Sequence, residues 1–419
     1  MKRINDFIEK NIVKVIVIFL FAGPFLDLVT SILINFLDIN LTIGIMIRGL
    51  FLAFILYYSI FITKSKNKKQ INIIIGIVLT YMLIHSTYTF LNKELFMTEA
   101  QNIIRIFYFP LLMLGLFNVF TDKREEVNYS KYFFYIFMTY LLLVLIPNVF
   151  NIGLDSYEIA KVGSIGLFNS ANEVGAILAI LLPFTIHELL KLKNIILKIL
   201  IIFSIGYVFL TIGTKAPLIA LVLVIMFFII KYIIECIKKK ETKKIAIIST
   251  LFVVAITASV LIFPKTSFYQ NIRIHLDYLE IDNISEVITD FHVIDHFIFS
   301  ERLSFLEAEM NNYKEANAIE KFIGIGSATN TERKNVEIDI FDIFFSIGII
   351  GLIVYIIPIG YAFKKTTNTK KVDSIWLCSF ILIILFAMLT GHILVKPSVS
   401  IFAVIIMLEL FKYKDKRVF

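Results

Sequence analysis

The chain of 419 residues is 58% hydrophobic and has a mean hydropathy of +0.84. Soluble domains are about 45–50% apolar, so this composition excludes an ordinary soluble enzyme and indicates a membrane protein. The formal net charge of +8 would suit a nucleic-acid partner, but the positions of the basic residues, described below, argue against one.

Twelve apolar segments approach the length of about 20 residues that a helix needs to cross a bilayer. Lone strands are excluded, because their backbone groups would be unpaired in lipid. We therefore predict an all-α polytopic membrane protein with about twelve transmembrane helices. The segments lie near residues 12–34, 41–62, 71–91, 103–120, 132–150, 172–190, 195–212, 216–234, 245–263, 338–363, 374–393 and 398–411.

Lysine and arginine gather at both ends of the chain and in alternate loops, such as 64–69, 231–244 and 364–371. Short cytoplasmic loops carry this excess in membrane proteins. We therefore expect both termini to be cytoplasmic. The basic balance then reflects topology and contact with anionic lipid, and no nucleic-acid partner is expected.

The one long polar insertion runs from residue 264 to 337 and holds more acidic than basic residues, the opposite of the inside loops. It divides the chain into helices 1–9 (1–263), an extracytoplasmic loop domain (264–337) and helices 10–12 (338–419). Apolar residues at helical spacing predict two amphipathic helices in the loop, over 284–298 and 303–313. Gly324 and Gly326 predict a turn after the second.

Several charged side chains fall inside the predicted spans, where they are costly and usually functional. Arg48, Arg105, Glu173 and Lys215 all lie toward the predicted outer half. Such a basic group would bind an anion, and a lipid phosphate or diphosphate suits a site open to the bilayer. The alternatives are side chains that reach the membrane surface or internal salt bridges, such as Arg48 with Asp27.

Three acidic residues, Glu337, Asp339 and Asp342, open the tenth span as E-x-D-x-x-D. A carboxylate here could take a proton from an attacking hydroxyl, hold a cation or cap the helix. His292 and His296 have the spacing of metal ligands on a helix, but no third ligand is evident, so no metal is expected.

Five segments in chain order resemble one family. They are GLFNSANEVGAILAILLPF (166–184), TIGTKAPLIALVLVI (211–225), SERLSFLEAEM, FIGIGSATN and VEIDIFDIFFSIGIIG. They resemble motifs of the O-antigen ligase and polysaccharide polymerase superfamily (WaaL- and Wzy-like), and GPFLDLV near the start resembles its Gram-positive branch.

The resemblance implies a metal-independent glycosyltransferase of the bacterial plasma membrane that uses no cofactor. Its donor would be a glycan on undecaprenyl pyrophosphate at the outer face, and its partners would be the glycan acceptor, membrane lipids and other polysaccharide-assembly proteins. The family's basic residues that hold the pyrophosphate correspond to Lys215 and Arg302, and its proposed base, a histidine, falls near Glu337. The chain departs from the family at two points: lysine replaces the usual arginine at 215, and acidic residues replace the histidine.

The resulting hypothesis is a polymerase of lipid-linked oligosaccharide repeats. Glu337 and Asp339 are the candidate catalytic residues, and the candidate substrate-binding residues are Lys215, Arg302, Arg48, Arg105 and Glu173. Two alternatives stay open: a ligase that transfers finished glycan to a lipid or wall acceptor, and a flippase or other transporter of lipid-linked sugars.

Overall fold

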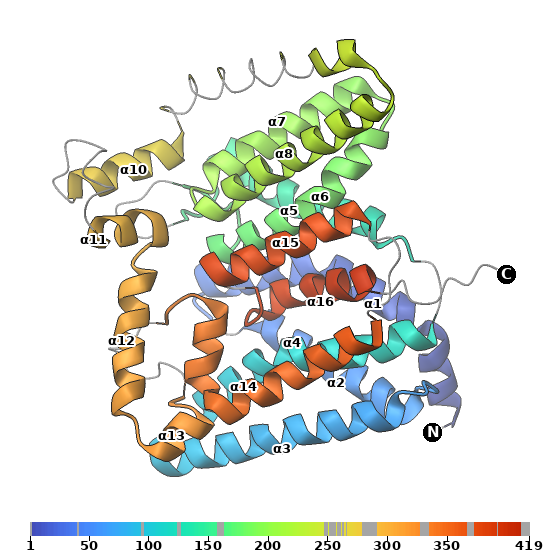
Figure 1. Ribbon diagram of the computed structural model, residues 1–419, viewed down its shortest axis with the longest axis vertical. Helices are drawn as coiled ribbons and strands as arrows, with labels where there is room; N and C mark the ends of the chain where they lie inside the picture. Colours follow the sequence, from blue (N-terminus) through green and yellow to red (C-terminus); the bar gives the residue numbers. More distant parts are fainter. Residues whose placement is uncertain are drawn as a thin grey trace. The chain divides into compact units, whose positions relative to one another are not determined.

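A computed structural model describes residues 2–39, 42–93, 96–123, 127–156, 163–246, 266–278, 291–326, 335–366, 373–391 and 393–411, with a few single residues between 250 and 264 (Figure 1). Across these ranges the secondary structure is helical, with one isolated bridge between Asp155 and Ser164 and no strand. The prediction of an all-α fold is confirmed.

Eight of the described helices are long and apolar enough to span a membrane, and three shorter apolar helices cover 195–211, 374–389 and 397–410. Together they correspond to every predicted span except the ninth, which lies mostly outside the described residues. Polar residues cap the N-termini of some of these helices. Asn194 accepts hydrogen bonds from the amides of Ile196 and Leu197, and Asp373 accepts one from Ile375.

The chain divides into two compact units, 1–132 with 294–419, and 133–293. The first unit contains α1 (Lys2–Asn35), α2 (Ile43–Tyr57), η1 (Tyr58–Ile62), α3 (Lys68–Lys93), α4 (Phe96–Asp122), η4 (Asp295–Phe299), α12 (Arg302–Glu315), α13 (Ala318–Ile323), α14 (Asp339–Thr366), α15 (Ser374–Leu389) and α16 (Pro397–Phe411). The second contains most of α5 (Tyr129–Val149), α6 (Ala171–Lys191), α7 (Ile195–Thr211), α8 (Lys215–Lys238) and α10 (Ser267–Tyr278), and α11 (Phe291–Ile294) lies at the boundary.

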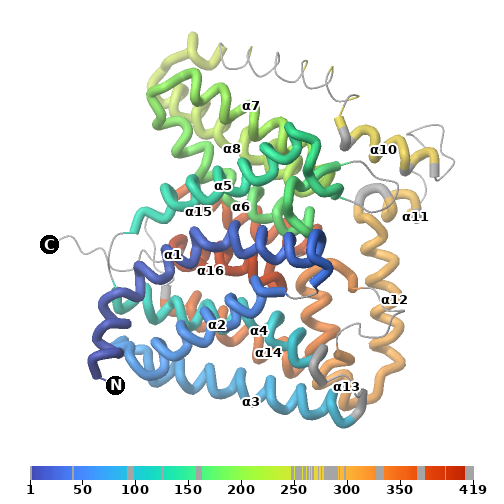
Figure 2. The backbone as a smooth tube through the Cα atoms, turned by 180° about the vertical axis from the view of Figure 1, so that it is seen from behind, coloured from blue at the N-terminus to red at the C-terminus, as the bar shows by residue number. Residues whose placement is uncertain are grey.

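Helix α4 is central to the first unit, where it packs against α2, α3, α14 and α16. Figure 2 shows this group from behind. Gly115 permits the close approach of α2, because a Cβ there would lie 2.5 Å from a methyl carbon of Ile55. Helices α2–η1 and α4 end together, since Thr63 and the backbone amide of Lys64 both donate hydrogen bonds to Asp122. The two helices therefore begin at the same end of the unit.

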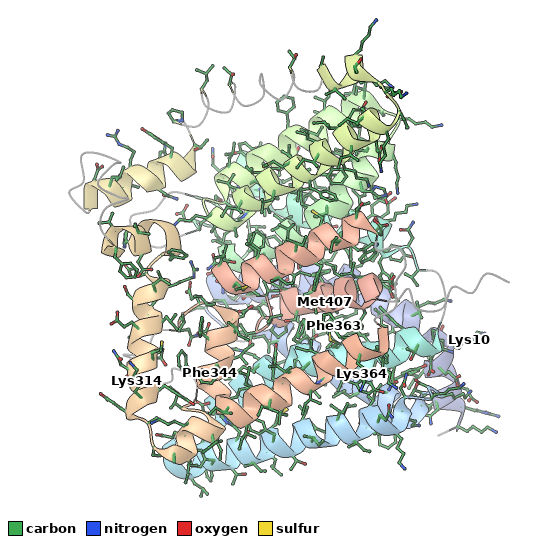
Figure 3. All side chains as sticks on the ribbon, viewed as in Figure 1. Lys10, Lys314, Phe344, Phe363, Lys364 and Met407 are labelled. Carbon is green, nitrogen blue, oxygen red and sulfur yellow. The ribbon has the colours of Figure 1, made fainter. Side chains whose placement is uncertain are left out.

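Helix α12 confirms the second of the two predicted loop helices, and the predicted glycine turn follows α13. Helices α12 and α13 cover the end of the first unit at which α2 and α4 begin. We call it the capped end. Phe344 of α14 lies beside α12, its ring centre 5.0 Å from that of Tyr313 (Figure 3). This contact belongs to an apolar cluster that buries Ile325, Val336, Ile338 and Phe345. Of the other predicted loop helix, over 284–298, residues 291–298 are helical, as α11 and most of η4, and residues 284–290 lie outside the described residues.

Helix α14 bends at Gly348, whose backbone (φ 65°, ψ −171°) is not helical. The predicted tenth span is therefore two helical segments that meet at an angle (Figure 1). The bend brings Gly348 against the glycine turn after α13: a Cβ on Gly348 would lie 2.5 Å from the amide nitrogen of Gly324. Only glycine adopts such a backbone readily and leaves room for a second chain.

In the second unit, α6 is the most buried span and packs chiefly against α8. Gly175 permits this contact, because a Cβ there would lie 2.9 Å from Cγ of Pro217. The first turns of α6 and α8 consequently lie side by side, although 44 residues separate their starting positions, Ala171 and Lys215.

Candidate functional site

Arg302 is the first residue of α12, and its position follows from an unusual helix start. Ser300 and Glu301 both have left-handed backbones, with φ of 56° and 65°. The buried carboxylate of Asp295 then accepts hydrogen bonds from the amides of Leu303 (2.9 Å) and Ser304 (2.8 Å). Asp295 thus satisfies the orphan donors of the helix in place of an ordinary N-cap residue.

Arg302 is 8% exposed, and its guanidinium contacts the segment that leads into α14. Its Nη2 lies 2.8 Å from Oε2 of Glu337, and its Nε donates to the Glu337 carbonyl at 3.2 Å. Further hydrogen bonds run to the carbonyls of Phe299 (3.1 Å) and Thr390 (3.5 Å). The arginine therefore joins three segments at the capped end.

Glu337 is the more accessible partner, with 31% of its side chain exposed. Its backbone is left-handed (φ 61°), a conformation that non-glycine residues rarely adopt and that recurs at functional sites. Gly391 lies directly against it, because a Cβ on Gly391 would be 2.6 Å from the Glu337 carbonyl oxygen. Glu337 thus combines an unusual backbone conformation with a partly exposed carboxylate, and Arg302 and the loop at Gly391 hold it in place.

Asp339, the second candidate base, is fully buried. Its Oδ2 accepts hydrogen bonds from the amides of Ile393 (2.9 Å) and Leu394 (2.7 Å), which lie between α15 and α16. Asp342 accepts one from the amide of Val336 at 2.8 Å. Both aspartates therefore bind backbone amides, whereas the carboxylate of Glu337 is partly exposed and contacts a side chain, that of Arg302.

Three side chains that the sequence did not single out as site residues anchor the glycine turn after α13. The phenol oxygen of Tyr81 lies 2.7 Å from the Ile323 carbonyl and 2.6 Å from that of Ile347. His85 also contacts the Ile323 carbonyl, and its Nε2 lies 4.0 Å from the buried carboxylate of Glu99. Polar and ionisable residues inside predicted spans are the sequence signal that could have revealed these three side chains.

Arg48 is 4% exposed and lies 2.7 Å from Asp27 of α1. This is the internal salt bridge that the sequence left open as the alternative to a ligand contact. Arg105, by contrast, has a buried Nε with no hydrogen-bond partner within the part of the chain that the structure describes. Both arginines lie on helices that begin at the capped end.

Glu173 and Lys215 lie in the adjacent first turns of α6 and α8, in the second unit. Ser170 caps α6 by accepting a hydrogen bond from the Glu173 amide at 3.4 Å. Thr214 precedes α8, and its buried hydroxyl has no partner among the described residues. The structure thus brings together Arg302, Glu337 and Asp339 in one unit, and Glu173 and Lys215 in the other.

No three His, Cys, Asp or Glu side chains group closely enough to hold a metal ion within the described ranges. His296, one of the two histidines with metal-ligand spacing, lies 2.8 Å from Glu301. The side chain of His292 lies outside the described residues. We therefore assign no metal ligand.

Comparison with known proteins gives one match, to a family model described as O-antigen ligase like membrane protein. It covers residues 9–287 and 285–416, nearly the whole chain. The searches of curated proteins and of solved structures find no match.

Proposed function

The chain belongs to the family of O-antigen ligase-like membrane proteins, and from this premise we propose that it polymerises lipid-linked oligosaccharide repeats. The reaction would take place at the outer face of the membrane, at the capped end of the first unit. Donor and acceptor would both be glycans carried on a polyprenyl diphosphate. The pairing of Arg302 with Glu337 is the observation that carries this proposal.

The pair offers the two groups that glycosyl transfer from a diphosphate needs. A carboxylate removes the proton from the acceptor hydroxyl, and a guanidinium stabilises the negative charge of the departing diphosphate. Glu337 and Arg302 lie 2.8 Å apart. By the family resemblance, Glu337 falls near the position of the expected histidine, and Arg302 corresponds to a basic residue that holds the diphosphate. Both are held by backbone contacts at a strained turn, which suits a preorganised site.

In the proposed reaction the acceptor oxygen attacks the anomeric carbon of the donor sugar. A new C–O bond forms while the bond from that carbon to the diphosphate breaks. Glu337 receives the acceptor's proton, and the diphosphate leaves with the electron pair. When the diphosphate binds Arg302, it displaces the carboxylate of Glu337 from the ion pair, so donor binding frees the base.

Lys215, in the second unit, would bind substrate through its positive charge. It stands at the start of a 24-residue helix, where the helix dipole favours an anion. The unpartnered hydroxyl of Thr214, within the described part of the chain, adds a donor beside it. Lysine acts there as a point charge and lacks the bidentate geometry of arginine. Asp339 would serve as a positioning residue rather than the base, because both of its backbone contacts hold the loop beside Glu337.

The competing function is a ligase that transfers finished glycan to another acceptor, and the family description favours it. The two functions differ in the product that accumulates when the gene is deleted. Loss of a polymerase leaves single repeats on the lipid carrier, whereas loss of a ligase leaves long unattached polymer.

The direct test uses the purified full-length protein in lipid nanodiscs with a lipid-linked repeat as substrate. Glu337→Gln is expected to lower chain lengthening at least about 100-fold and to leave donor binding nearly unchanged. Arg302→Ala should weaken both. Glu315→Gln, at an exposed glutamate of α12, is the matched control. Normal polymer length with Glu337→Gln would refute the assignment of the base.

A further inference from the structure

Helix α4 carries three buried polar atoms that have no hydrogen-bond partner among the described residues: Nε of Arg105, the phenol oxygen of Tyr108 and Oδ1 of Asn118. The amide nitrogen of Asn118 donates a hydrogen bond to Ser59, so only Arg105 and Tyr108 are considered further. Tyr108 is 1% exposed, and Arg105 is partly buried. Arg105 and Tyr108 are three positions apart on one helix, so their side chains are neighbours on the same face. This face is separate from the contacts of Arg302 and Glu337.

Such an arrangement costs folding free energy, because a buried donor loses its hydrogen bonds to water without gaining others. The cost is larger for an arginine inside a membrane span. Buried polar groups in folded proteins are nearly always satisfied, and an exception calls for a physical explanation: backbone strain, a catalytic role, or a bound water, ion or ligand. A single ligand that satisfies both groups must offer hydrogen-bond acceptors to the guanidinium and to the phenol.

The surrounding charges indicate an anion. Arg48 lies on α2, which packs against α4. Its own charge is balanced by Asp27, at 2.7 Å. The charge of Arg105 has no such counterpart within the described ranges. A guanidinium beside a phenol presents several N–H donors and one O–H donor, a set that suits the oxygens of a phosphate.

We propose that Arg105 and Tyr108 bind the phosphate of a membrane lipid, at a site separate from the Arg302–Glu337 pair. The identity of that lipid rests on the proposed function. A polymerase joins two lipid-linked glycans, and Arg302 accounts for the diphosphate of the donor. The site on α4 holds the diphosphate of the acceptor. The same chemistry would accept an anionic phospholipid headgroup, and the experiment separates these two sources.

The test measures lipid binding to the purified full-length protein in nanodiscs of neutral phosphatidylcholine. One arm adds a short-chain polyprenyl diphosphate, and the other adds phosphatidylglycerol. The variants are Arg105→Ala and Tyr108→Phe, and the matched control is Arg273→Ala, at an exposed arginine of α10. Arg105→Ala is expected to weaken binding about tenfold or more and Tyr108→Phe by a smaller factor, whereas the control leaves it unchanged.

Loss of affinity for the polyprenyl diphosphate assigns the site to the acceptor. Loss for phosphatidylglycerol alone assigns it to a lipid headgroup. Unchanged affinity for both probes overturns the proposal. Thermal unfolding without added lipid gives a second criterion: removal of an unsatisfied group should leave Tm equal or higher, and a lower Tm in both variants would indicate a structural role instead.

Failure of the lipid-phosphate site and failure of the proposed function give different results. If Glu337→Gln keeps full transfer activity while Arg105→Ala loses phosphate binding, the anion site stands and the catalytic assignment falls. If Glu337→Gln is inactive and Arg105→Ala binds both probes normally, the reverse holds.

Discussion

Glu337 and Asp339 are two residues apart in the sequence, and their surroundings in the structure differ sharply. Asp339 is fully buried and accepts hydrogen bonds from two backbone amides, whereas Glu337 keeps nearly a third of its side chain exposed beside Arg302. A carboxylate satisfied by fixed amides is a structural group, and one that can exchange its partner is available for chemistry. We therefore propose Glu337 as the base and Asp339 as a positioning residue, where the sequence offered both as catalytic.

Replacement of Asp339 with alanine should destabilise the protein by about 2–4 kcal/mol, because the amides of Ile393 and Leu394 lose their acceptor in a buried place. Asp339→Asn keeps one acceptor oxygen and should recover part of this loss. Thermal unfolding in detergent measures both. Equal Tm values for the two variants would argue against the hydrogen bonds as the source of stability.

At the scale of elements, α14 and α13 depend on each other through two glycines. The bend at Gly348 and the turn at Gly324 place two backbones closer than any side chain would allow. The phenol oxygen of Tyr81, on α3, contacts one carbonyl from each of these two backbones, those of Ile323 and Ile347. The bend sets the direction of the segment that starts at Asp339, and so it also sets the position of Glu337 next to it.

Gly348→Ala should therefore destabilise the protein by about 2–4 kcal/mol, through both the left-handed backbone and the clash with Gly324. Gly360→Ala is the matched control on the same helix, because nothing lies within 4 Å of its Cβ position. That variant should be neutral or gain up to about 1 kcal/mol of helix propensity. Thermal unfolding and hydrogen exchange at α13 would report the difference, and equal behaviour of the two variants would contradict it.

For the whole molecule, the central prediction is the orientation in the membrane. The basic loops predict that both termini are cytoplasmic and that α12 lies outside. Lys314 of α12 and Lys66, between η1 and α3, are both exposed and would lie on opposite sides. The native cysteines, Cys236 and Cys378, are buried and should give little background.

In intact cells, a membrane-impermeant maleimide should label Lys314→Cys. It should label Lys66→Cys only after the cells are permeabilised. The reverse pattern would invert the topology and move the Arg302–Glu337 pair to the cytoplasmic side. The proposed reaction at the outer face would then be untenable.

The sequence by itself determined the fold class, nearly all the spans and the residue types of the site. These follow from the length of apolar runs and from the cost of charge in lipid, which are local properties of the chain. Only the tertiary structure decided which charges meet. Arg302 pairs with a glutamate 35 positions away, Asp339 binds amides 54 and 55 positions away, and Arg48 pairs with Asp27 across two helices. Long-range packing decides whether a buried charge finds a partner within the protein or needs a ligand, and no local spacing in the sequence contains that information.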